Sequence, residues 1–311
     1  MESLLMATKV VVPMAMMVGI GVLFRIFGLA DGPTMKKVDG MIFNVFMPMV
    51  SFYNIYNTDF GQFQSVGYIV YGVAAMMVEF LLAMLVIPKY IKPMPTAASY
   101  GQAVYRTNYL IFGTAVAESI YGSGNFGMVT LLGSVTVPLV NAQAAIQLET
   151  ARQGTADGKK LLLAVVKNPT VIATAAALAV NFTGLVLPEL VLGVVKDLAG
   201  LTTPLSFLSI GVTLSLGMVA RKSYLISGVA LRLAVIPAIF LPIGVMLDFR
   251  GQELCALLIL LAAPTAVSSY PMAVAMDADG EFAAQMVAYT TVFCLPTIFI
   301  FTWVLNTFGF M

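Results

Sequence analysis

The stretch Ala263-Pro-Thr-Ala-Val-Ser-Ser-Tyr-Pro271 decides the fold, because two prolines interrupt an apolar segment long enough to cross a membrane. Each proline removes a backbone donor and crowds a carbonyl of the preceding turn, so a regular helix cannot continue through it. Unwound backbone at membrane depth survives only where it is buried in protein or lines a cavity. The stretch therefore predicts a broken helix beside a binding cavity. The alternative is a pair of proline kinks that are tolerated for packing.

A second stretch, Tyr105-Arg-Thr-Asn-Tyr-Leu-Ile-Phe-Gly-Thr-Ala115, occupies the equivalent place in the first half, because a shift of 156 residues puts Asn108 on Pro264. Here Gly113 and Thr114 are expected to loosen the helix. Half-helix N-termini carry positive partial charge and suit an anion such as a carboxylate. We expect the substrate to contact these positions of the two breaks: Arg106, Asn108, Gly113, Thr114, Ser268, Ser269 and Pro271.

The composition indicates that the chain lies in a membrane. Of 311 residues, 60% are apolar and only 10% are charged, and the mean hydropathy is +0.95. Soluble chains carry roughly 25% charged residues. The chain is therefore an integral membrane protein, and a soluble enzyme or a nucleic-acid binder is excluded. It has no histidine, which removes His-ligated metals, haem and Ser/Cys–His catalysis. We expect no cofactor and no metal, and Cys255 and Cys294 to be packing residues.

A bilayer core needs about 20 mostly apolar residues per helix. The expected fold is all-α and polytopic, a single membrane domain over residues 1–311 with short connections. We expect the first apolar run to be a span rather than a cleaved leader, because residues 25–31 hold no small-residue cleavage site. We expect ten spans, at residues 7–28, 38–56, 66–88, 100–122, 125–148, 164–185, 190–218, 223–247, 252–276 and 280–308.

Lysine and arginine are distributed unequally between the connections, and the basic side of a membrane protein faces the cytoplasm. The opposite side holds little beyond Lys9, Lys196 and Arg250. We therefore expect a multi-pass protein of the plasma (inner) membrane with both termini outside. The basic side holds Lys36, Lys37, Lys89, Lys92, Arg152, Lys159, Lys160, Arg221 and Lys222.

The shift of 156 residues also superposes prolines and glycines: Pro13 on Pro169, Pro48 on Pro204, Gly28 on Gly184, Gly61 on Gly217, Gly72 on Gly228 and Gly124 on Gly280. Residues 1–148 and 164–311 then form two repeats of five spans. An odd number of spans inserts the second repeat upside down, and inverted repeats are typical of transporters with alternating access. The alternative is a helical bundle whose prolines coincide by chance.

Five stretches resemble the auxin efflux carrier (PIN-like) family, which includes bacterial organic-acid permeases. The longest is Asn108-Tyr-Leu-Ile-Phe-Gly-Thr-Ala-Val-Ala-Glu-Ser-Ile-Tyr-Gly122, similar to the fourth-helix motif of that family. Ala115 stands where the family usually has a proline. The other stretches are Pro48-Met-Val-Ser-Phe52, Lys167-Asn-Pro169, Thr203-Pro-Leu205 with Gly211, and Ala263-Pro-Thr-Ala266 with Tyr270-Pro-Met-Ala273.

The resemblance implies ten helices in two inverted repeats, with helices 4 and 9 broken and crossing. It implies a scaffold of helices 1, 2, 6 and 7 that also forms a homodimer. It implies a transport core of helices 3–5 and 8–10 that moves as an elevator. By the same resemblance, Asn108 meets the substrate carboxylate, with Ser51 and Asn141 nearby.

Four charges within the spans remain open between structural and functional roles, since a charge at the bilayer centre costs about 2.5–3.5 kcal/mol on insertion scales. Glu79 and Arg232 are expected near mid-depth, either as an ion pair or as a proton or substrate site. Glu118 is expected beyond the first break, near an outer vestibule. Arg106 either extends to the headgroups or supplies a second cation for a dicarboxylate.

The leading hypothesis is a secondary transporter of a small organic anion, a carboxylate or dicarboxylate, with proton or sodium as its coupling ion if it has one. The alternative is a cation/proton antiporter or sodium-coupled symporter of the same architecture, which would carry an acid at the crossing. A membrane-embedded enzyme lacks its catalytic residues here, and no nucleotide-binding loop is present. The expected partners are the substrate, the lipid bilayer and a second copy of the chain.

Overall fold

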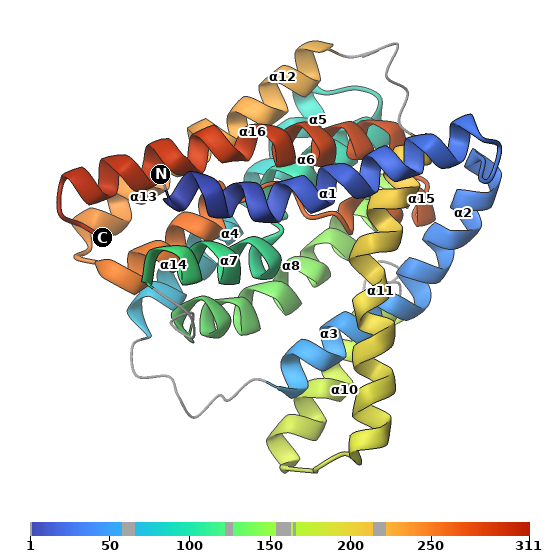
Figure 1. The fold of residues 1–311 in the computed structure, drawn as a ribbon, viewed down its shortest axis with the longest axis horizontal. Coiled ribbons are helices and arrows are strands. Elements are labelled where there is room, and N and C mark those ends of the chain that lie inside the picture. The colour runs from blue at the N-terminus through green and yellow to red at the C-terminus, as the bar shows by residue number, and fades with distance from the viewer. Residues whose placement is uncertain (1, 58–65, 122–126, 154–162, 164–165, 214–221) are drawn as a thin grey trace.

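The computed structural model describes residues 2–57, 66–121, 127–153, 163, 166–213 and 222–311. Within these residues the chain is helical, and the only extended pairing is one isolated bridge between Thr107 and Thr265. Figure 1 shows α11 running alongside α3 and α10, in a group that projects from the other helices.

The first half contains α1 (Glu2–Ile26), α2 (Gly32–Met41), the π-helical turn η1 (Ile42–Phe46), α3 (Met47–Tyr56), α4 (Gly67–Leu85), α5 (Ile87–Tyr90), α6 (Met94–Tyr105), α7 (Tyr109–Tyr121) and α8 (Gly127–Gln153). The second half contains α10 (Pro169–Thr183), α11 (Glu189–Thr213), α12 (Lys222–Ala230), the π-helical turn η3 (Leu231–Val235), α13 (Ile236–Met246), α14 (Gly251–Ala262), α15 (Ser269–Ala275) and α16 (Gly280–Thr307).

Local sequence signals explain several helix ends. Asp31 caps α2 by accepting a hydrogen bond from the Thr34 amide at 2.9 Å. Asn168 caps α10 by accepting from the Thr170 amide at 3.0 Å. Gly184 ends α10 with φ of +66°, a left-handed conformation that glycine adopts without strain. These caps fix the connections between consecutive helices.

Each of the ten expected stretches contains a described helix, but their lengths differ. Four segments among the described residues are long and apolar enough to cross a membrane: Gly67–Tyr90, Gly127–Arg152, Glu189–Thr213 and Lys222–Met246. Two parts of α16, Gly280–Cys294 and Pro296–Thr307, are bent by 41° relative to each other. Counting them together as one crossing raises the total to five. Gly251–Ala262 and other apolar helices are shorter than a full crossing. The structure supports a multi-pass membrane protein, and ten crossings remain a prediction.

Two packing groups position the site. In the first, α1 packs on α11, and α3 packs on α10 and α11. In the second, α14 is enclosed, with every residue of 254–262 buried, and it packs against α7, α8 and α13. Buried side chains of α4, α6, α14 and α16 form the main hydrophobic core. Because α14 is surrounded by protein, its break is also enclosed by protein.

Candidate binding site

Two helices break at one place in the bundle. Helix α6 ends at Tyr105 and α7 begins at Tyr109, while α14 ends at Ala262 and α15 begins at Ser269. The two breaks form an antiparallel pair, in which the Asn108 amide donates to the Pro264 carbonyl at 2.8 Å. The Ala266 amide donates to the Arg106 carbonyl at 2.9 Å. Each break therefore satisfies backbone groups that the other leaves free.

The first break lies at residues 106–108, and our placement of it at Gly113 and Thr114 was wrong. Helix α7 runs continuously through both positions. Gly113 is instead a packing glycine, because a Cβ there would lie 2.6 Å from Cγ1 of Val129. The side chain of Thr114 lies outside the described residues. The break occurs earlier because the Asn108 amide bonds across to Pro264 rather than back along its own helix.

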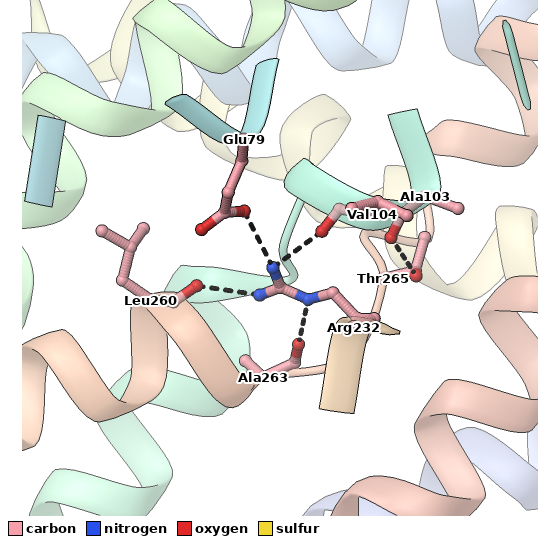
Figure 2. Close-up of polar contacts among 7 residues, drawn as sticks. All are labelled: Glu79, Ala103, Val104, Arg232, Leu260, Ala263 and Thr265. Carbon is pink, nitrogen blue, oxygen red and sulfur yellow. Dashed lines mark hydrogen bonds and ion pairs between the residues drawn. The ribbon is translucent and has the colours of Figure 1, made fainter. Parts of the chain in front are cut away.

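Arg232 holds the broken ends together, as Figure 2 shows. Its guanidinium donates to the carbonyls of Val104 at 2.9 Å, Leu260 at 2.8 Å and Ala263 at 2.9 Å. These carbonyls lie at the C-terminal ends of α6 and α14, where helix dipoles favour a cation. Arg232 therefore binds the freed ends of both half-helices.

The charge of Arg232 is balanced by Glu79 of α4. The Arg232 Nη1 and Glu79 Oε2 atoms lie 3.5 Å apart, and both side chains are buried. Buried charges persist when they are paired and their hydrogen bonds are satisfied. Of the two roles expected for these residues, the contacts favour the structural ion pair. Figure 2 also shows Thr265 donating to the Ala103 carbonyl at 2.8 Å, a further link between the breaks.

A cavity of about 530 Å³ lies beside the two breaks. Its walls are α3, α8, α11, residues 106–109 of the first break and residues 266–268 of the second. Five of the expected binding residues line it: Ser51, Arg106, Asn108, Asn141 and Ser268. The structure thus brings together residues from four separate segments of the chain.

A chain of polar side chains crosses this cavity wall. Arg106 donates from Nη2 to Asn141 Oδ1 at 2.9 Å, and Asn141 donates from Nδ2 to Ser51 Oγ at 3.1 Å. Arg106 also donates from Nη1 to Gln102 Oε1 at 3.2 Å and to the sulfur of Met272 at 3.0 Å. These hydrogen bonds connect the first break to α8 and α3.

Arg106, unlike Arg232, has no counter-charge among the described residues. Its side chain is 1% exposed, and no carboxylate of the described residues lies within ion-pair distance of it. Its side-chain hydrogen-bond partners Gln102, Met272 and Asn141 are all neutral. Arg106 does not extend to the headgroups; it is a buried cation at the wall of a cavity.

Asn108 offers a free donor at the same place. Its amide nitrogen Nδ2 is buried and makes no hydrogen bond, and the hydroxyl of Thr107 is also unpartnered. Both residues line the cavity. On a regular helix Arg106 and Asn108 would lie about 200° apart. The break removes that separation, because the intervening backbone is extended.

Ser269 and Pro271 do not line the cavity. Both are buried in α15, and the Ser269 carbonyl accepts a hydrogen bond from Gln102 Nε2 at 3.1 Å. Sequence reasoning missed Lys196, an exposed residue of α11 that lines the cavity. The one sequence feature that could have pointed to Lys196 is that few cations lie on its side of the membrane, opposite the basic connections.

The fold and the cavity define a multi-pass membrane protein with a polar site between broken helices. The family model described as membrane transport protein matches residues 139–302, just over half of the chain. The chain therefore belongs to this family, the auxin efflux carrier (PIN-like) family, which is a family of transporters and not of enzymes. A search of curated proteins finds no match. The matched region contains Asn141 and the second break.

Proposed function

We propose that the protein is a secondary transporter of a small organic anion that carries one or two carboxylates. The observation that carries this proposal is the buried guanidinium of Arg106 at the cavity wall, without a carboxylate partner among the described residues. A buried charge with no counter-charge costs several kcal/mol. An anion bound in the cavity supplies the missing charge.

The other polar groups of the cavity suit the same ligand. Asn108 and Thr107 have free hydrogen-bonding groups, and Lys196 adds a second cation at an exposed part of the wall. No acidic side chain is among the described residues that line the cavity. One carboxylate fits the neutral donors near Asn108, and a second fits the planar fork of Arg106.

The crossing supports alternating access between inverted repeats. Asn108 and Pro264, which the shift of 156 residues superposes, are hydrogen-bonded to each other. The cavity lies between α3 and α11 on one side and the two breaks with α8 on the other. In the proposed mechanism the breaks and α8 move as an elevator against a scaffold of α1, α2, α3, α10 and α11. The scaffold forms the homodimer, and the termini face outward.

The alternative of a cation/proton antiporter has less support. An antiporter of this architecture needs an acid at the crossing, and the described cavity wall offers cations and neutral groups instead. The side chain of Glu118, the nearest acid in the sequence, lies outside the described residues. The cavity chemistry therefore favours an anion.

A binding screen on the purified protein tests the proposal. Ligands that bind the folded state raise the melting temperature, so we expect acetate, lactate, succinate or related carboxylates to raise it. The screen is run with and without sodium, at two pH values. Tetraethylammonium and glucose serve as cationic and neutral controls. A response to cations alone, with none to any carboxylate, would contradict the proposal.

A further inference from the structure

The carboxylate of Asp39 in α2 is fully buried, with 0% of the residue exposed. Neither of its two oxygens makes a hydrogen bond. An ionised carboxylate in this state is strongly unfavourable, because it has lost water without gaining a donor or a cation. The group must therefore be neutral or have a cation bound.

The groups around Asp39 are neutral hydroxyls. Helix α2 packs on α11 and α15, and the Ser209 and Tyr270 hydroxyls of those helices face the carboxyl group. Ser209 donates to the Tyr270 oxygen at 3.5 Å, and Tyr270 and Thr213 share a hydrogen bond of 3.0 Å. We name Asp39, Ser209, Thr213 and Tyr270 the inner seam. Its hydroxyls bond to one another, and it contains no cation that would balance a negative charge on Asp39.

No charged side chain of the packed, described elements pairs with Asp39. Lys36 and Lys37 precede it on α2, but both are exposed. Helix α11 carries Lys196 and Asp197 near its other end, and both are exposed. After α15, Asp277 is exposed, and Asp279 accepts hydrogen bonds from Thr96 and the Phe282 amide. A proton is therefore the simplest cation that neutralises Asp39.

The inner seam lies at the end of the cavity remote from Lys196. Along α11, residues from Lys196 to Ser206 line the cavity, and Ser209 comes one turn later. At 1.5 Å per residue, Lys196 and Ser209 are about 20 Å apart along the helix. The seam joins α2 and α11 to α15, which follows the second break. It therefore lies beyond the end of the cavity remote from Lys196, and it includes α2, the helix that carries Lys36 and Lys37.

We propose that Asp39 is a proton-binding site, and that its bound proton keeps the inner seam closed. Loss of the proton leaves a charge that water must hydrate, so deprotonation favours separation of α15 from α2 and α11. Only the last step, in which seam opening exposes the cavity to the other side of the membrane, rests on the proposed transport function.

Labelling with a hydrophobic carbodiimide tests the proton directly, because this reagent adds to protonated carboxyl groups in apolar surroundings. We expect mass spectrometry to find the adduct on Asp39, decreasing about tenfold per pH unit above a single midpoint. Glu79, equally buried but paired with Arg232, is the internal control and should stay unlabelled. Protection of Asp39 by sodium at constant pH would overturn the proposal in favour of a sodium site.

The melting temperature of Asp39→Asn gives a second, ligand-free test. Aspartate in the unfolded chain loses its proton at about pH 4, below the pH at which the folded protein releases it, so between these two pH values the wild type loses stability as the pH rises. The amide of Asn mimics the neutral carboxyl, so the variant should melt higher than the wild type, by a margin that grows across this range of pH and is constant above it. Equal pH dependence in both proteins would overturn the proposal.

Seam opening is measured with Ser209→Cys. We expect its reaction with a water-soluble maleimide, divided by the rate of a free thiol at the same pH, to accelerate with rising pH, and to stay slow in the double variant with Asp39→Asn. A rate that is independent of pH, or equal in both backgrounds, would refute the link between proton and seam. Carboxylate binding is measured in a separate experiment. Failure of the anion proposal can therefore be told apart from failure of the Asp39 proposal.

Discussion

At the scale of single residues, the two buried arginines show how different surroundings give different roles. Arg232 has a carboxylate and three carbonyls around it, so its charge and its hydrogen-bonding capacity are used within the protein. Arg106 has neutral partners and a cavity beside it. This contrast makes Arg106 the better candidate for contact with a ligand.

Arg106→Lys should weaken the binding of dicarboxylates such as succinate about tenfold or more, with a smaller effect on monocarboxylates such as lactate. Lysine keeps the charge but lacks the planar fork that binds a carboxylate through two hydrogen bonds. Isothermal calorimetry measures the dissociation constants. Arg25→Lys, at an exposed position, is the matched control. An equal loss for both ligand classes would remove Arg106 from the second carboxylate site.

Asn108→Ala should abolish the binding of both ligand classes, because it removes the free donor at the crossing without changing any charge. Its backbone hydrogen bond to Pro264 does not involve the side chain, so the variant should fold. Calorimetry on the folded protein measures the effect, with the exposed Asn306→Ala as control. Unchanged affinity would place the carboxylate elsewhere.

At the scale of elements, the sequence located one break and misplaced the other. Pro264 marked the second break correctly, because a proline affects its own helix. The first break contains no proline, and its position is set by hydrogen bonds to residues 264–266, which are remote in the sequence. Lys196 and Asp39 were missed for a related reason. Each gains its meaning only from the helices packed around it, which no local pattern indicates.

Arg232→Met should destabilise the protein by about 3–5 kcal/mol, because it leaves Glu79 buried without a counter-charge. It also removes the donors to three carbonyls at the crossing. Adding Glu79→Gln should restore part of the lost melting temperature by removing the unpaired charge. Arg250→Met is the exposed control. No recovery in the double variant would show that the carbonyl contacts alone account for the loss.

Gly21→Ala should destabilise the contact between α1 and α11, because a Cβ at Gly21 would lie 2.9 Å from the Cα of Gly211. Overpacking of this kind costs about 1–3 kcal/mol. Gly19→Ala lies on the same helix with no atom within 4 Å of its Cβ, so it should be neutral or slightly stabilising. Thermal unfolding compares the two variants, and equal melting temperatures would show that α1 moves aside easily.

At the scale of the whole molecule, composition was the most reliable signal, since 10% charged residues cannot cover a water-facing surface. The helical membrane class followed directly from it. The number of crossings did not, because broken and bent helices such as α14 are shorter than a bilayer. Partners such as a second copy of the chain leave no comparable signal in composition.

Single cysteines at Lys36 and Arg250 should react with a membrane-impermeant maleimide from opposite sides of the membrane. The reason is the unequal distribution of basic residues, which puts Lys36 on the cytoplasmic side. Cys255 and Cys294 are both buried, so their background reaction should be slow. Labelling of both positions from the same side would refute the proposed topology.

Cysteine pairs between α3 and the segment from α6 to α7 should crosslink in two different registers if the breaks move against the scaffold. One register should be favoured when a carboxylate is bound, because a ligand shifts the population toward the state that binds it better. Pairs between α1 and α11 serve as the fixed control, since both belong to the proposed scaffold. A single register under all conditions during continuing transport would contradict an elevator.

The contact between Arg232 and the Leu260 carbonyl has a consequence for how relatives of this chain can vary. In a regular helix that carbonyl would accept from the amide of residue 264, which is a proline and has no N–H. The guanidinium thus replaces a donor that the proline removed. A relative that lost this proline would regain its own donor and depend less on the arginine, so the two positions should co-vary. An alignment of relatives would then show as a correlated pair two residues that lie 32 positions apart in this chain.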